Sequence, residues 1–133
     1  MKTSRSILVV MAIAVVALVG ACTSTPSASG SGAAVNLQDE IVATSKGLDD
    51  ALVAYKAGDK AKAEQLVGDA YEDHFELVEG PLGKADMAFM EGLEDLIRAD
   101  ARNAMKDGKP VADVEALVTK AKADLATAAT KLK

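Results

Sequence analysis

Residues 66–97, LVGDAYEDHFELVEGPLGKADMAFMEGLEDLI, decide the fold of this chain because they hold two amphipathic segments joined by a short turn. Apolar residues recur in both segments at spacings of three and four, which is the period of a helix with one buried face. A Gly-Pro pair at 80–81 interrupts the first segment, and Asp86 is suited to cap the second. The pattern predicts one helix over 60–79 and another over about 86–107.

Similar stripes flank this hairpin on both sides. Residues 36–57 and 113–132 carry apolar side chains at helical spacing, and no segment alternates polar and apolar residues as a half-buried strand does. The connections are short, so neighbouring helices should run antiparallel. We expect an all-α fold, an antiparallel up-down-up-down four-helix bundle over residues 36–133. Many inward positions are alanine, so close helix approach has to fill the core.

The beginning of the chain has the features of an export signal. Lys2 and Arg5 precede an apolar run over 7–19, and small residues follow directly before Cys22. The run is short for a membrane span, which favours a signal peptide over residues 1–21. The small residues with the cysteine resemble the lipobox of bacterial lipoproteins, which implies that the thiol is acylated, with palmitate for example, and becomes the mature N-terminus. The alternative is an unmodified cysteine after an ordinary signal peptide.

The mature chain is expected to be acidic and tethered outside the cytoplasm. Residues 22–35 contain the lipidated cysteine and a Ser, Gly and Thr-rich flexible linker, after which the bundle domain begins. Without the signal peptide, 13 basic and 20 acidic side chains remain, a formal charge of −7. This charge argues against nucleic acid as a partner and favours cations or basic protein surfaces.

The hairpin concentrates hard oxygen ligands. Residues 71–80 and 90–95 together hold seven acidic side chains. Carboxylates spaced by three or four residues share a helix face, and such pairs can approach one hard cation such as iron. The alternative is a solvated acidic face. The expected metal ligands are Glu76, Glu79, Glu91 and Glu94, with Glu72 and Asp73 in second place.

Softer ligands lie in the same hairpin. On a helical wheel the single histidine, His74, falls on the apolar face, and Met87 and Met90 lie about one turn into the following helix. A histidine with thioethers suits copper(I) or haem iron, although methionines commonly fill a core. Asp100 also falls on an apolar face, where a carboxylate needs a partner, whereas Arg98 is expected to face outward.

The spacing of the hairpin and the last helix resembles the extracytoplasmic helical region of bacterial high-affinity iron permeases. That resemblance implies a helical domain that presents iron to a permease. The permease family uses an Arg-Glu-Gly-Leu-Glu motif in its membrane helices, and residues 90–94, MEGLE, depart from it at the first position. The residues that carry the resemblance are Tyr71, Phe75, Glu76, Glu79, Gly80, Asp86, Glu94, Leu96, Gly108, Asp113, Val114, Glu115, Ala116, Leu117, Asp124 and Leu125.

These features predict a non-enzymatic accessory lipoprotein that binds or presents iron, anchored to the cell-envelope membrane and associated with an iron permease or another membrane complex. With Cys22 assigned to the lipid and His74 alone, no nucleophilic catalytic constellation is formed. The alternative function is a structural lipoprotein whose acidic helices dock on a membrane complex without metal.

Overall fold

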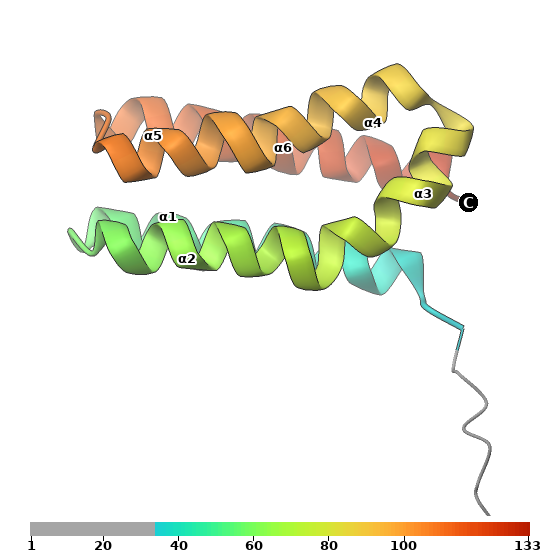
Figure 1. Cartoon of the computed structure of the whole chain (residues 1–133), viewed down its shortest axis with the longest axis horizontal. Coiled ribbons are helices and arrows are strands. Elements are labelled where there is room, and N and C mark those ends of the chain that lie inside the picture. The colour runs from blue at the N-terminus through green and yellow to red at the C-terminus, as the bar shows by residue number, and fades with distance from the viewer. Residues whose placement is uncertain (1–33) are drawn as a thin grey trace, which may run out of the picture. The chain divides into compact units, whose positions relative to one another are not determined.

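The computed structural model describes residues 34–133, which form four helices with no strand among them (Figure 1). The all-α prediction is confirmed for this part of the chain. The predicted signal peptide, the lipidation of Cys22 and most of the predicted linker lie outside the described residues. Within residues 34–133, no helix is both long and apolar enough to cross a membrane.

Two of the four helices are regular, and two contain a π-helical segment. The first helix is α1 (Leu37–Lys56) and the fourth is α6 (Val111–Lys131). The second helix is made of α2 (Lys60–Ala70), the π-helical η1 (Tyr71–Phe75) and α3 (Glu76–Ala85), and the third of α4 (Met87–Glu94), the π-helical η2 (Asp95–Ala101) and α5 (Arg102–Asp107).

The helix ends carry several of the predicted signals. The carboxylates of Asp59 and Asp86 each accept a hydrogen bond from the amide three residues later, at 3.0 and 3.1 Å. They satisfy amides that have no partner within the first turn. Gly58 and Gly108 adopt φ values of 89° and 70° after the first and third helices, a conformation that favours glycine.

Two predicted boundaries are wrong. The second helix continues through Pro81 to Ala85, because a proline removes one helical hydrogen bond without preventing the following turn, and Leu82 in that turn is fully buried. The last helix begins at Val111 rather than at 113, because the carbonyl of Pro110 already accepts hydrogen bonds from the amides of the first turn.

The helices lie in two layers. α1 packs against α2 and α6, and α2 also packs against α5. Figure 1 shows α1 and α2 in one layer and α5 and α6 in the other, with α3 leading from the first layer to α4. The side-chain amide of Gln38 donates to the carbonyl of Ala129 at 3.0 Å, which joins the start of α1 to the end of α6. The junction of α3 and α4 lies at this same end, since Lys131 pairs with Asp86 at 2.9 Å.

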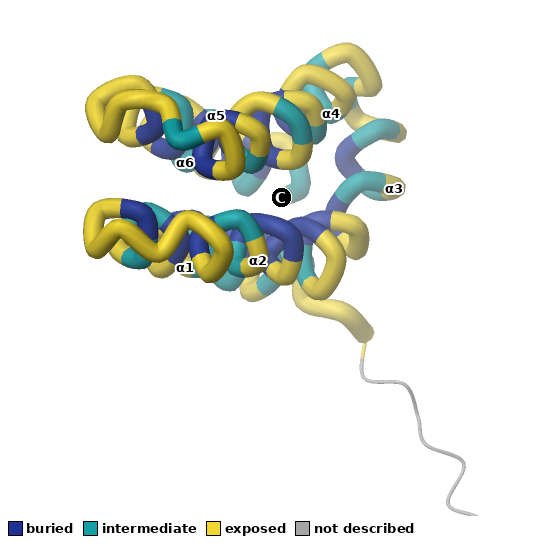
Figure 2. Tube along the Cα trace, turned by 60° about the vertical axis from the view of Figure 1, so that its left-hand side comes forward, coloured by how far each residue is buried: buried dark blue, intermediate teal, exposed yellow. Residues whose placement is uncertain are grey.

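The core depends on close helix approach, as the alanine-rich stripes predict. A Cβ placed on Gly47 of α1 would lie 2.5 Å from the Cβ of Ala70 on α2, so the glycine is what lets these helices meet. Buried and exposed positions alternate along every helix (Figure 2), and Phe75 is the largest fully buried side chain. The Tyr55 hydroxyl donates to the carbonyl of Lys109 and ties α1 to the link before α6.

Both π-helical segments change which residues face the core. A π-turn is closed by i→i+5 hydrogen bonds and holds an extra residue, so the side chains are displaced relative to a regular helix. In η1 Phe75 is fully buried, whereas the side chain of His74, predicted to point inward, is 39% exposed. In η2 Ala101 is fully buried, whereas Asp100, also predicted to point inward, is exposed. The inward predictions for His74 and Asp100 are therefore wrong, and both residues lie in a π-turn.

Candidate functional site

The two π-helical segments contribute to one polar groove between the second and third helices. Tyr71 opens η1 and Arg98 lies in the middle of η2. The guanidinium carbon of Arg98 lies 5.7 Å from the centre of the Tyr71 ring, which is within range of a cation–π contact. π-turns inside α-helices frequently occur at functional sites, so this groove is the first place to look for one.

The Tyr71 hydroxyl lies between two carboxylates from different helices. It donates to Oε1 of Glu79 at 2.6 Å and also lies 3.3 Å from Oε1 of Glu94. A hydroxyl has a single hydrogen, and the shorter contact identifies Glu79 as its main acceptor. Glu94 instead accepts a charge-assisted hydrogen bond from Nη1 of Arg98 at 2.7 Å. Four side chains are therefore linked, with two negative charges and one positive charge among them.

The environment of Tyr71 keeps its phenol protonated. Burial raises the pKa of Tyr71 well above its ordinary value, and the hydrogen bond to Glu79 and the negative charges of Glu79 and Glu94 raise it further. The pKa of Arg98 is also raised, chiefly by its hydrogen bond to Glu94. At neutral pH the phenol is consequently a hydrogen-bond donor to Glu79, and any direct bond from its oxygen to a metal ion requires loss of that proton.

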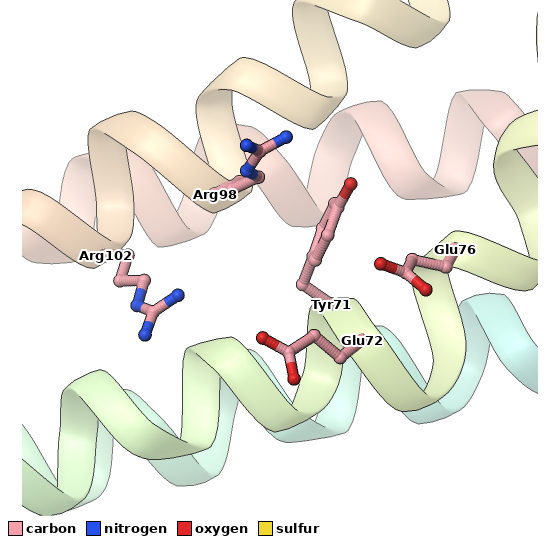
Figure 3. Close-up of a pocket in the computed structure, with 5 residues that line it drawn as sticks. All are labelled: Tyr71, Glu72, Glu76, Arg98 and Arg102. Carbon is pink, nitrogen blue, oxygen red and sulfur yellow. The ribbon is translucent and has the colours of Figure 1, made fainter.

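The groove beside Tyr71 has a volume of about 410 Å³. Figure 3 shows the aromatic ring standing between the helices, with two arginines on one helix and two glutamates on the other. The Arg102 guanidinium lies over Gly68 of α2, where a Cβ would be 3.5 Å from its central carbon, and its Nε is 3.5 Å from Oε1 of Glu64. The lining residues are Tyr71, Glu72, Glu76, Arg98 and Arg102.

The structure brings some of the predicted oxygen ligands together and separates others. Glu79 and Glu94 both lie beside the Tyr71 hydroxyl, and Glu72 and Glu76 line the adjoining groove. Asp73 and Glu91 are exposed and line neither the groove nor the Tyr71 cluster. Within residues 34–133 there is no group of three or more histidine, cysteine, aspartate or glutamate side chains close enough to hold a metal ion.

The predicted soft ligands do not share one site. Nδ1 of His74 is 2.7 Å from Oε2 of Glu40, which directs the imidazole toward α1. Met87 and Met90 instead lie beside Gly83, in a groove between α3 and α4 that His74 does not line. The combination of His74 with both thioethers, as predicted for copper or haem, is not assembled.

Sequence reasoning missed the residues that join the cluster. Tyr71 has no predicted site role, and Arg98 is expected to face outward. The pair from Glu94 to Arg98 has the i,i+4 spacing of a helical ion pair, and this signal was available. The contact between Arg98 and Tyr71 cannot be predicted from the sequence, because it depends on how two helices pack.

The sequence matches no family model, and neither a curated protein nor a solved structure matches the chain.

Proposed function

We propose that this protein is a lipid-anchored, extracytoplasmic bundle of up-down-up-down topology that binds a hard metal cation, iron in first place, between its second and third helices. The observation that supports the proposal is the approach of Glu79 and Glu94 to the hydroxyl of Tyr71, at 2.6 and 3.3 Å. Carboxylate and phenol oxygens are the donors that hard cations prefer, and the three side chains come from two helices that would hold them in place.

Binding at this cluster has an internal competitor. The Arg98 guanidinium lies 2.7 Å from Glu94 and neutralises one of the two carboxylates. A cation would displace this guanidinium from Glu94 and would take the phenol proton if Tyr71 becomes a ligand. Water molecules from the adjoining groove of about 410 Å³ would complete the coordination shell. Iron binding should consequently release a proton and become tighter when Arg98 is replaced.

Calorimetric titration of the full chain with ferrous iron and with chelated ferric iron tests this proposal. We expect saturable binding with Kd below about 1 mM, a loss of at least about tenfold in Glu79→Gln and Glu94→Gln, and a gain in Arg98→Gln. Glu115→Gln is the matched control, because Glu115 lies on α6 and pairs with Lys56 at 3.0 Å. Binding no tighter than millimolar, or equal binding by all these variants, rejects the ligand role.

The second candidate function is docking on a membrane complex without metal. The observation that favours it is a run of exposed carboxylates along the second helix, namely Asp69, Glu72, Asp73 and Glu76. Such a stripe suits a basic protein surface. If docking is the function, Asp69→Asn/Asp73→Asn should reduce crosslinking of the chain to its envelope partner, and Glu79→Gln/Glu94→Gln should not.

The proposed role within the cell envelope is accessory and non-enzymatic. The partner we propose is an iron permease or another membrane complex, reached through the lipid on Cys22. Mass spectrometry of the chain isolated from membranes tests the anchor, because a diacylated Cys22 at the mature N-terminus has a defined mass. An unmodified cysteine, or a chain that still carries residues 1–21, would contradict it.

A further inference from the structure

A second groove lies between α3 and α4, away from the face where His74 meets α1. Its volume is about 440 Å³. Two methionines and two glycines account for most of its lining, and one acidic and one basic residue complete it. These residues are Glu79, Gly80, Gly83, Lys84, Met87 and Met90.

The two methionines converge on one point in this groove. A Cβ placed on Gly83 would lie 3.4 Å from Cε of Met90 and 3.5 Å from both Cε and Sδ of Met87. Gly83 has no side chain, so both thioether groups occupy the space beside it. They approach this space from the first turn of α4, at positions three residues apart on one helix face.

Core packing does not account for both of these methionines. Met105 is the core methionine, fully buried in α5, and Met90 packs partly against the core. Met87 is 55% exposed, so its thioether is open to solvent and to any ion in the groove. Thioethers are polarizable soft donors, and two that lie together, one of them open to solvent, can contact the same ion.

We propose that Met87 and Met90 bind a soft monovalent cation of the copper(I) or silver(I) class. Thioethers are neutral soft donors that select copper(I), and they lose no proton on binding. Glu79 lines the groove and supplies negative charge that favours a cation, whereas Lys84, which also lines it, opposes one. Unlike the proposed oxygen site at Tyr71, this site should therefore bind its ion without releasing a proton.

The test is a silver(I) titration of the full chain in detergent, carrying ¹³C-methyl methionine and the substitution Cys22→Ser to remove the competing thiol. Silver(I) replaces copper(I) because it is not oxidised in air. We expect the methyl resonances of Met87 and Met90 to shift together along one saturable curve. The resonance of buried Met105 should not move, and it serves as the internal control.

Substitution by leucine conserves volume and keeps the fold, so it separates binding from stability. Met87→Leu and Met90→Leu should each weaken silver(I) binding by about tenfold or more, whereas Met105→Leu should not. The proposal is overturned if only the Met87 resonance shifts, if neither shifts, or if Met87→Leu/Met90→Leu keeps its affinity. Failure of iron binding at Tyr71 would leave this result unaffected, because the readout is the methionine methyl groups alone.

Discussion

All four helices bury an apolar stripe, but they differ in regularity. α1 and α6 are regular helices, whereas the second and third helices each contain a π-turn. Along α6 the fully or almost fully buried residues Val114, Val118, Ala121 and Leu125 follow the expected steps of three and four. In the second and third helices the buried apolar residues also keep such steps through each π-turn, but His74 and Asp100, which were expected on the same face, lie outside it. The difference shows that the period assigns apolar positions correctly in all four helices, but misplaces a polar residue next to the stripe where a π-turn interrupts the helix.

The two pairs of helices also differ in what their polar side chains do. α1 and α6 are joined by Lys122 to Asp49 at 2.6 Å and by Lys56 to Glu115 at 3.0 Å, in ion pairs whose side chains are about one-third to one-half exposed. Such pairs contribute at most about 1 kcal/mol each. The interrupted helices instead place a buried tyrosine between carboxylates. The regular helices thus carry exposed ion pairs, whereas the interrupted helices hold a buried polar cluster at Tyr71.

The largest expected effect on stability tests which of two neighbouring residues of η1, Phe75 or His74, faces the core. Phe75→Ala removes a fully buried ring and should lower the free energy of unfolding by about 3–5 kcal/mol. His74→Ala, one position earlier, should cost about 1 kcal/mol or less, because the His74 side chain is 39% exposed and loses only its contact with Glu40. Urea unfolding monitored by circular dichroism measures both. A larger cost for His74→Ala than for Phe75→Ala would mean that the helix is regular here.

The next largest effect on stability tests the close contact between the regular helix α1 and α2, the first part of the interrupted second helix. Gly47→Ala places a Cβ 2.5 Å from that of Ala70, so the helices must separate. Overpacking costs about 1–3 kcal/mol, against a gain of about 1 kcal/mol in helix propensity. We expect a net loss of about 1 kcal/mol in thermal or urea unfolding.

Gly92→Ala is the matched control for this substitution. Apart from its chain neighbours and the backbone of its own helix, nothing lies within 4 Å of a Cβ added at Gly92, and the residue is inside α4. It should stabilise the protein by up to about 1 kcal/mol through helix propensity. Equal effects of the two substitutions would show that α1 and α2 are not in close contact.

The sequence is sufficient for the helical class, for the cap at Asp86 and for the alanine-rich packing. It was insufficient for the π-turns, because a π-turn has no residue signature and is retained through tertiary contacts such as burial of Phe75. The helix through Pro81 was missed for a similar reason: packing of Leu82 outweighs the local cost of a proline. Local sequence patterns indicate helix propensity and period, whereas the π-turns and the path through Pro81 depend on packing between helices.

The same limit applied to the candidate site. Glu79 and Glu94 were predicted because carboxylates are visible in a sequence, and both reach the Tyr71 cluster. Tyr71 and Arg98 were missed because their importance arises from a contact between η1 and η2. His74 had the most distinctive side chain in the hairpin, yet its direction depended on the one residue that η1 adds.

A smaller effect, on the pH dependence of stability, tests the buried Tyr71 in the second helix. The pKa of Tyr71 in the folded protein is raised above its ordinary value of 10.0 by burial first and by Glu79 second. The folded state therefore holds this proton more tightly than the unfolded state does. The resulting stabilisation is complete below about pH 10 and is lost as the pH rises through the folded-state pKa.

Tyr71→Phe should lower the free energy of unfolding by about 1 kcal/mol at neutral pH, because Glu79 loses its donor. The difference between wild type and variant should shrink above about pH 10, where wild type alone loses the contribution of the Tyr71 proton. Urea unfolding of both proteins from pH 7 to pH 11 measures this. A constant difference across that range would show that Tyr71 titrates alike in the folded and unfolded states.

The smallest expected effect gives the sharpest test of η2. Asp100→Ala should change the free energy of unfolding by no more than about 0.5 kcal/mol, because the side chain is exposed. In a regular helix the same carboxylate would face the core, and its removal would have a large effect of either sign. Ala101→Asp is the companion measurement: Ala101 is fully buried, so an unpaired charge there should cost at least about 3 kcal/mol. A small effect at 100 with a large one at 101 is expected only if Asp100 lies outside the core and Ala101 lies inside it. The reverse result would place Asp100 inside the bundle and Ala101 outside it.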